Sequence, residues 1–144
     1  MGKRRYSREL VIKFLYLVDM NEGSVSEQLD QFWERNDCQP DIKVYVEDLL
    51  NTIFKNKEAI DTLLEKYSDN WTLSRMAVID RNLLRLATCE IMYAAATVPP
   101  KVAIDEAVEI AKKYGSEDSP NFINGILDRV LKERKAVAES TSES

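Results

Sequence analysis

Histidine is absent from the 144-residue sequence. This absence excludes an imidazole general base, a Ser-His or Cys-His nucleophile and any histidine-ligated metal site. The only two cysteines, Cys38 and Cys89, lie 51 positions apart and make neither a zinc-ligand pattern nor a disulfide framework. We expect both to be reduced, buried and inert small hydrophobic side chains. No metal site is predicted.

Turn residues and long apolar runs are also scarce. Four glycines and four prolines are too few for the many turns of a β-sandwich or barrel. No run of 18 apolar residues exists, and the opening MGKRRYSREL has no signal-peptide core. Glycine-rich phosphate loops and nucleophile-elbow motifs are missing as well. We therefore expect a soluble, cytoplasmic protein that is not an enzyme and needs no cofactor or membrane.

Charge is distributed unevenly along the chain. Residues 1–14 contain five basic side chains and one acidic side chain, which leaves +4 there and −9 on the rest, for a total of −5. A basic arm on an acidic body suggests a localised contact with a polyanion. The alternative is a flexible terminus whose charges only keep the protein soluble.

Apolar residues recur at helical spacing almost throughout, and no segment alternates with the period of a strand. We expect an all-α protein of about seven helices in two packed helical subdomains. Capping and breaking residues bound the expected helices. These helices cover about residues 4–22, 25–36, 41–55, 57–67, 76–94, 102–114 and 120–135.

The polar segment 68–70 is the best internal boundary. It divides the chain into an N-terminal helical subdomain with the basic arm, residues 1–70, and a C-terminal helical subdomain, residues 71–135. The small and polar residues 136–144 predict a disordered tail.

The first helix is the most informative element. At 100° per residue, its apolar stripe predicts an outward face that carries Arg5, Arg8, Ile12 and Tyr16. Arginine matches phosphate with two hydrogen bonds, and an exposed tyrosine ring can stack on an unpaired base. This face therefore suggests binding to single-stranded RNA. An ordinary amphipathic helix with surface charges is the alternative.

Two further features stand out. Around the start of the last helix, Phe122 lies at the edge of the apolar stripe, and Asn121 and Asn124 are near a helix N-terminus that favours anions and polar partners. The alternative is a capped helix start with Phe122 in the core. Glu90 interrupts an apolar helix, and we expect an ion pair with another helix to satisfy it.

Four segments make the sequence resemble the NusB family of bacterial transcription antitermination factors. The C-terminal block carries the most specific motifs, P-x-K-V-A-I-x-E-A-V-E-x-A-K and F-I-N-G-I-L-D. The resemblance covers about residues 3–134, and the matching segments are KRRYSRELVIKFLY (3–16), Trp71, IDRNLLRLATCEI (79–91) and VPPKVAIDEAVEIAKKYGSEDSPNFINGILDRV (98–130).

The resemblance implies binding to the boxA element of ribosomal-RNA leader transcripts. The partner would be NusE, a small-subunit ribosomal protein, within the antitermination complex on RNA polymerase. The residues that the resemblance assigns to RNA, together with the exposed aromatic candidates, are Lys3, Arg4, Arg5, Arg8, Tyr16 and Phe122. Those it assigns to the partner surface are Tyr16, Asp118 and Phe122, beside Glu117 and Ser119 of the same acidic and serine-containing segment. Asn124, near the N-terminus of the last helix, is a further candidate for partner binding.

We therefore expect a non-enzymatic, RNA-binding antitermination factor, in which Arg5→Ala and Arg8→Ala weaken RNA binding and leave the fold intact. Two alternatives stay open. One is an RNA-recruiting module like those fused to ribosomal-RNA methyltransferases, although we expect no methyl-donor-binding Rossmann domain here. The other is a helical protein-interaction module with an incidental arm. A homodimer of the free protein that hides the arm is also compatible with the sequence.

Overall fold

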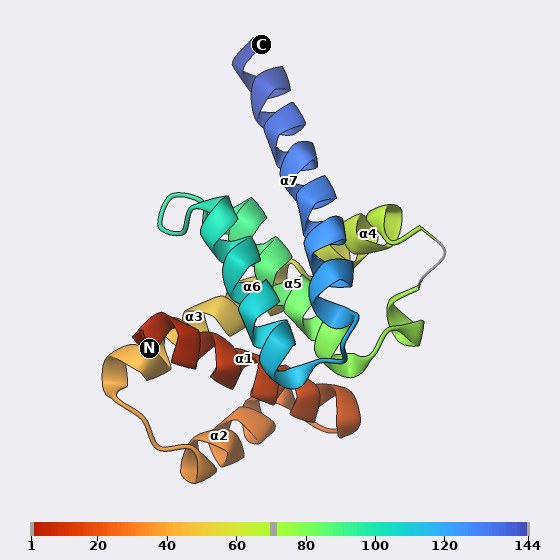
Figure 1. The fold of residues 1–144 in the computed structure, drawn as a ribbon. Helices are drawn as coiled ribbons and strands as arrows, with labels where there is room; N and C mark the ends of the chain where they lie inside the picture. Colours follow the sequence, from red (N-terminus) through yellow and green to blue (C-terminus); the bar gives the residue numbers. More distant parts are fainter. Residues whose placement is uncertain (1, 70–71, 144) are drawn as a thin grey trace.

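Seven α-helices and one short 3₁₀-helix make up the computed structural model, which describes residues 2–69 and 72–143 (Figure 1). No strand occurs within these ranges, so the all-α prediction is confirmed. In chain order the elements are α1 (Lys3–Met20), α2 (Val25–Arg35), α3 (Pro40–Lys55), α4 (Lys57–Tyr67), the 3₁₀-helix η1 (Leu73–Arg75), α5 (Val78–Tyr93), α6 (Pro100–Tyr114) and α7 (Ser119–Glu143).

Local signals set most helix ends. The hydroxyl of Ser24 accepts a hydrogen bond from the Glu27 amide at 3.3 Å and caps α2 as predicted. Pro40 and Pro100 are the first residues of α3 and α6, a position at which the helix does not need the backbone N–H that proline lacks. Because Pro100 is part of the helix, α6 begins two residues earlier than expected. Asn56 separates α3 from α4 at the predicted break.

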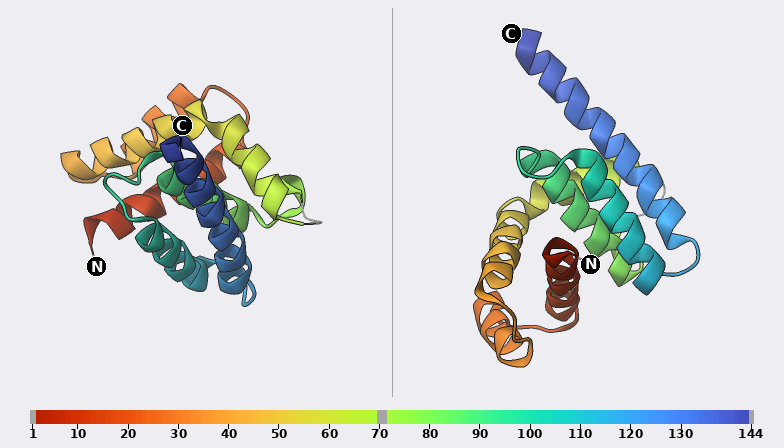
Figure 2. Two further views of the ribbon diagram at one scale, coloured as in Figure 1. Left: turned by 90° about the horizontal axis from the view of Figure 1, so that it is seen from above. Right: turned by 60° about the vertical axis from the view of Figure 1, so that its left-hand side comes forward.

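The centre of the molecule is α5, which packs against α1, α3, α4, α6 and α7. Its residues 82–91 are all buried, polar ones included, because neighbours surround the helix. Figure 2 shows α1 enclosed between the α2–α3 side and the α5–α6 side. The apolar residues of both halves join in one core. Asn70 and Trp71, where the subdomain boundary was placed, lie outside the described residues, so that division stays a prediction.

The C-terminal segment differs from the expectation. A disordered tail was predicted from Ala136, but α7 continues as a helix to Glu143 and extends away from the body (Figure 1). Adding residues to an existing helix avoids the cost of nucleation, and alanine and glutamate favour helices. The packed part of α7 therefore supports the extension.

The two cysteines are both free thiols. Cys89 is buried in α5 as expected, and burial raises the pKa of its thiol to about 12. Cys38 is only partly buried, so the prediction that both are enclosed holds for Cys89 alone. Among the described residues, no helix is long and apolar enough to cross a membrane, and no cluster of three metal-ligating side chains occurs.

Candidate nucleic-acid interface

Arg8 lies inside the protein, with 2% of its surface exposed. Its guanidinium donates two hydrogen bonds of 2.8 Å to the carboxylate of Glu90, from Nε to Oε1 and from Nη2 to Oε2. A third hydrogen bond of 3.2 Å joins Nη1 to Oε1 of Glu106. Glu90 is completely buried, so the predicted ion pair between this carboxylate and another helix is confirmed.

This geometry corrects the prediction for Arg8. Burial alone would lower the pKa of the guanidinium, but the hydrogen bonds and charge of Glu90 outweigh it and raise the pKa above its usual value. Arg8 therefore stays charged, with its hydrogen-bonding edge directed at two carboxylates. Its side chain fixes α1 to α5 and α6 and cannot reach a phosphate without breaking this pair.

The outward face of α1 is rotated from the predicted one. Ile12, expected outside, is buried like Arg8, because α5 covers that side of the helix. The side chains of α1 that do face solvent lie at about 240° to 320° on the helical wheel, so the exposed face is turned by about 80° from the predicted centre at about 200°. They are Tyr6, Lys13, Tyr16 and Met20.

Arg5 occupies the border of the buried ion-pair network. Its Nε donates to Glu106 Oε2 at 2.8 Å, and Nη2 contacts the same oxygen. These hydrogen bonds raise the pKa of Arg5, although burial opposes the shift. About three quarters of the side chain is shielded from solvent, and a carboxylate already offsets its charge. The predicted outward guanidinium is therefore only partly available.

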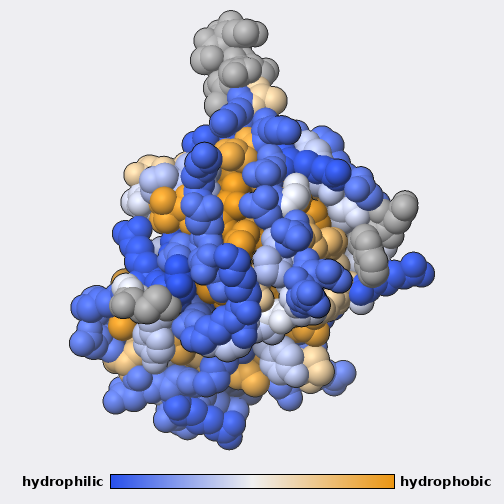
Figure 3. Space-filling model, viewed as in Figure 1, coloured by the Kyte–Doolittle hydropathy of each residue, from blue (hydrophilic) through white to orange (hydrophobic). Residues whose placement is uncertain are grey.

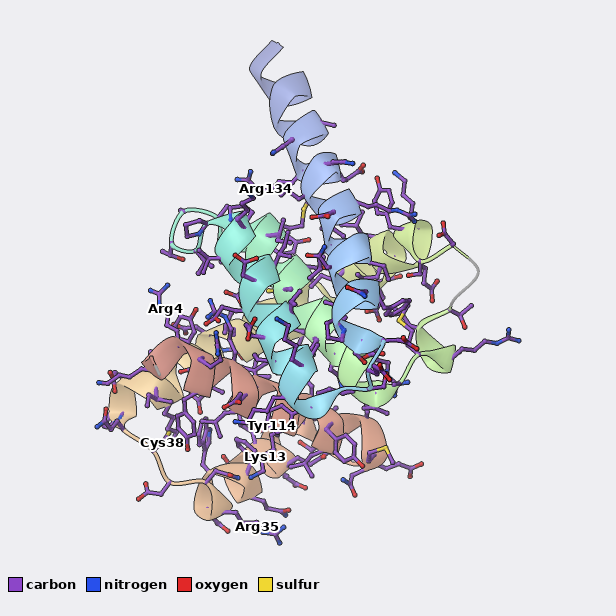
Figure 4. All side chains as sticks on the ribbon, in the orientation of Figure 1. Arg4, Lys13, Arg35, Cys38, Tyr114 and Arg134 are labelled. Atoms are coloured by element: carbon purple, nitrogen blue, oxygen red, sulfur yellow. The ribbon has the colours of Figure 1, made fainter. Side chains whose placement is uncertain are left out.

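Lys3 and Arg4 are the accessible cations at the N-terminal end of the arm. Lys3 pairs with Asp41 at 2.8 Å, but both side chains are exposed, and such a pair contributes little energy. Arg4 donates to the backbone oxygen of Thr97 at 3.3 Å, and its guanidinium lies 5.2 Å from the centre of the Tyr45 ring. Figure 4 shows Arg4 near the N-terminal end of α1, at the edge of the molecule. Both cations can exchange these surface contacts for phosphate.

A groove runs beside the exposed side of α1 and has a volume of about 640 Å³. Three tyrosines line it, each about half exposed: Tyr6 (43%), Tyr16 (49%) and Tyr114 (52%). We call it the tyrosine groove. Lys13 and Tyr114 are both on its wall and are labelled together in Figure 4. The remaining lining residues are Glu9, Leu10, Ile12, Leu17, Asn36 and Ile79.

Tyr6 and Tyr114 were not among the predicted site residues. The distance between Tyr6 and Tyr16 in sequence places them about 80° apart on α1, which a wheel centred on the correct face would have shown. Tyr114 comes from the last turn of α6, which packs on α5 and is joined to α1 by ion pairs such as that of Lys113 with Glu9. On the face drawn in Figure 3, polar side chains predominate and apolar ones surface only in narrow strips between them.

The second predicted region follows Tyr114 directly. Asp118 and Asn124 are exposed on the α6–α7 loop and the first turns of α7. Phe122 is partly buried and packs against the core, so its ring is neither fully exposed nor enclosed. The Phe122 amide donates to the backbone oxygen of Asp118 at 3.1 Å and orders the start of α7.

Comparison with known proteins identifies the family. The model of the NusB family matches residues 5–132. The chain belongs to the NusB family. It is 45% identical over 139 residues to the transcription antitermination protein NusB of Methylacidiphilum infernorum, with 94% of this chain and 96% of that protein covered. The NusB of Thermodesulfovibrio yellowstonii is 43% identical over 141 residues, with 91% and 93% covered.

Solved NusB structures share the fold. T. maritima NusB superposes with a TM-score of 0.83 at 36% identity, covering 92% of each chain. A chain in the crystal structure of the antitermination factors NusB and NusE in complex with dsRNA gives a TM-score of 0.81 at 27% identity, covering 92% of this chain and 98% of that chain. The resemblance seen in the sequence is thus confirmed.

Proposed function

We propose that this NusB-family protein is an RNA-binding transcription antitermination factor that acts in the cytoplasm without catalysing a reaction. Its target would be the boxA element of ribosomal-RNA leader transcripts, bound together with NusE in the antitermination complex on RNA polymerase. Relatives more than 40% identical over nearly the whole chain are transcription antitermination proteins, and a protein of the same fold has been crystallised with NusE and dsRNA.

The observation that carries the proposal is the pair of accessible cations, Lys3 and Arg4, at one end of α1, on which the tyrosine groove also lies. Cations supply affinity for the phosphate backbone, whereas aromatic rings can distinguish bases that are not paired. Arg5 would add a contact only by exchanging Glu106 for phosphate. Arg8 contributes by holding α1 in place.

Tyr16 stays a candidate for both RNA and partner contact, because its ring projects from the exposed side of α1. The exposed side chains of Asp118 and Asn124 are candidates for contact with NusE, and Phe122 offers a partly exposed ring beside them.

A titration tests this proposal. We expect the double variant Lys3→Ala/Arg4→Ala to bind labelled boxA RNA about tenfold more weakly or worse, because two charge-assisted contacts of about 1 kcal/mol or more are lost. The matched control, Lys132→Ala/Lys135→Ala, removes the same charge from exposed positions on α7 and should bind normally.

The titration is repeated in the presence of NusE. Unchanged affinity of the Lys3→Ala/Arg4→Ala variant would show that the arm is not the RNA site. A wild-type protein that binds NusE but adds nothing to RNA affinity would instead be a protein-interaction module.

A further inference from the structure

We infer that Glu106 is an internal competitor of RNA, whose carboxylate withholds the Arg5 guanidinium from the phosphates that the arm binds. This inference rests on the proposed function and deepens it, because it identifies a residue of α6 that sets the strength of RNA binding on α1. Glu106 acts through Arg5 and does not itself contact RNA, so it is a positioning residue.

Glu106 occupies the hydrogen-bonding edge that Arg5 would offer to a phosphate. The Nε of Arg5 donates to Glu106 Oε2 at 2.8 Å, and Nη2 contacts the same oxygen. A guanidinium binds a phosphate through two parallel hydrogen bonds from such a pair of nitrogens. A carboxylate and a phosphate cannot share this edge, so RNA gains the contact only when Glu106 is displaced.

The two carboxylate oxygens of Glu106 have different partners. Oε1 accepts a hydrogen bond from Arg8 Nη1 at 3.2 Å, whereas Oε2 accepts from Arg5. Arg8 is itself held by Glu90 through two hydrogen bonds of 2.8 Å. The buried pair therefore keeps Glu106 beside Arg5, and the contact with Arg5 can open while the Arg8–Glu90 pair stays closed.

Solvent exposure separates the two arginines. The side chain of Arg8 is 3% exposed and that of its partner Glu90 is 0% exposed, which puts both beyond the reach of a phosphate. Arg5 and Glu106 are 23% and 18% exposed, so a phosphate can approach their contact from solvent. Arg5 directly follows Arg4, about 1.5 Å further along the axis of α1, so a strand held by Arg4 lies close to it.

Electrostatics favour the closed contact. The hydrogen bonds to Glu106 raise the pKa of Arg5 against the effect of burial, and the charges of Glu106, Glu109 and Glu9 add to the rise. These carboxylates stabilise the guanidinium where it lies, and a phosphate must replace that stabilisation. Because both side chains are partly exposed, solvent and salt screen the pair, so its removal should change RNA affinity by a moderate factor.

The decisive variant is Glu106→Gln, which keeps the size of the side chain and removes its charge. The amide oxygen can still accept from Arg8, but the NH₂ group replaces Oε2 and cannot accept from Arg5. We expect boxA RNA to bind this variant about fivefold more tightly, because the released guanidinium adds a charge-assisted contact. The slope of log K against log salt should steepen by about 0.7, the contribution of one further phosphate.

Asp105→Asn is the matched control. Asp105 is exposed, directly precedes Glu106 and points about 100° away from it around α6, so this variant loses the same charge and leaves the Arg5 contact in place. Its salt slope should equal that of the wild type. Arg5→Ala and Arg5→Ala/Glu106→Gln complete a double-mutant cycle, in which Glu106→Gln should no longer strengthen RNA binding once Arg5 is absent.

NMR of the arginine Nε–H groups reports the contact directly. In the wild type, the Arg5 Nε–H should exchange slowly with water, and RNA should leave its signal in place. In Glu106→Gln it should exchange faster, and RNA should shift it. The Arg8 signal should stay unchanged in both proteins, because Glu90 holds that group, and this also shows that the variant is folded.

A single-stranded RNA of the same length and unrelated sequence is the second probe. Phosphate contacts carry no sequence information, so Glu106→Gln should strengthen its binding by the same factor as that of boxA RNA. A gain limited to boxA RNA would show that Arg5 contacts a base, and the inference would be wrong.

The remaining outcomes are distinct. If Lys3→Ala/Arg4→Ala loses boxA RNA but Glu106→Gln binds it no better than the wild type, the inference is wrong and the proposed function stands. The inference is also wrong if Asp105→Asn gains as much affinity, if the gain persists without Arg5, or if RNA shifts the Arg5 signal of the wild type. If the wild type binds no boxA RNA, both proposals fail.

Discussion

At the scale of single residues, the Arg8–Glu90 pair is the interaction with the largest structural consequence. Both side chains are withdrawn from water, and two hydrogen bonds of 2.8 Å join them. Desolvation of two charges costs several kcal/mol, which their mutual attraction recovers only while both partners are present. Removal of one partner leaves a bare charge in the core, whereas removal of both leaves none.

We expect Arg8→Ala to lower the free energy of unfolding by about 3–5 kcal/mol, because Glu90 is then buried without a partner. The double variant Arg8→Met/Glu90→Leu fills the space with apolar atoms and should be close to the wild type or more stable. Urea denaturation of the three proteins measures both effects. If Arg8→Ala unfolded like the wild type but failed to bind RNA, the guanidinium would have a direct role in binding.

This prediction replaces the one made from the sequence, in which Arg8→Ala left the fold intact. The sequence did indicate that Glu90 needs a partner, since a carboxylate in an apolar stripe is costly to bury. It could not identify Arg8 as that partner, because the two residues are 82 positions apart and only the packing of α1 on α5 brings them together.

At the scale of elements, helix type and helix ends could be predicted from local signals. The Ser24 cap, the break at Asn56 and the prolines at the starts of α3 and α6 act within one or two turns. The orientation of α1 could not be predicted this way. A helical wheel predicts which apolar side chains of α1 are buried. It does not predict that Ile12 and Arg8 are buried as well, because this depends on neighbouring helices on two sides of α1. The groove beside α1 depends on α6, whose position local patterns do not give.

Gly115 shows how closely two elements approach. It follows α6 with a φ of −91°, which any residue adopts, so its conformation does not require glycine. The lack of space at this position does require glycine, because a Cβ there would lie 2.6 Å from Ser119 Oγ and 2.8 Å from the backbone oxygen of Ala111. The turn from α6 into α7 therefore has no room for a side chain.

We expect Gly115→Ala to lower the free energy of unfolding by about 1–3 kcal/mol, the usual cost of overpacking. Gly125→Ala is the matched control, since a Cβ at that position in α7 meets nothing within 4 Å. Alanine has a higher helix propensity than glycine, so the free energy of unfolding of this control should rise by about 0.5–1 kcal/mol. Urea midpoints at constant m-value give both numbers, and a loss of stability in both variants would refute the steric explanation.

At the scale of the whole molecule, the charge distribution determines how RNA approaches. The arm within residues 1–14 carries +4, but the structure divides that charge unequally. The charge of Arg8 is paired with that of Glu90 inside the protein, and Arg5 is bound to Glu106. The acidic remainder repels a polyanion, so association is directed to Lys3, Arg4 and the groove beside α1.

This distribution predicts the salt dependence of RNA binding. For single-stranded RNA, the slope of log K against log salt is about −0.7 for each phosphate contacted. Three accessible cations, Lys3, Arg4 and Lys13, give about −2.1 for the protein without NusE, whereas contacts from all five arm cations would give about −3.5. Lys3→Ala/Arg4→Ala should bring the slope to about −0.7. A wild-type slope near −3.5 would mean that Arg5 and Arg8 leave their carboxylates on binding, in which case α1 must detach from α5 to engage RNA.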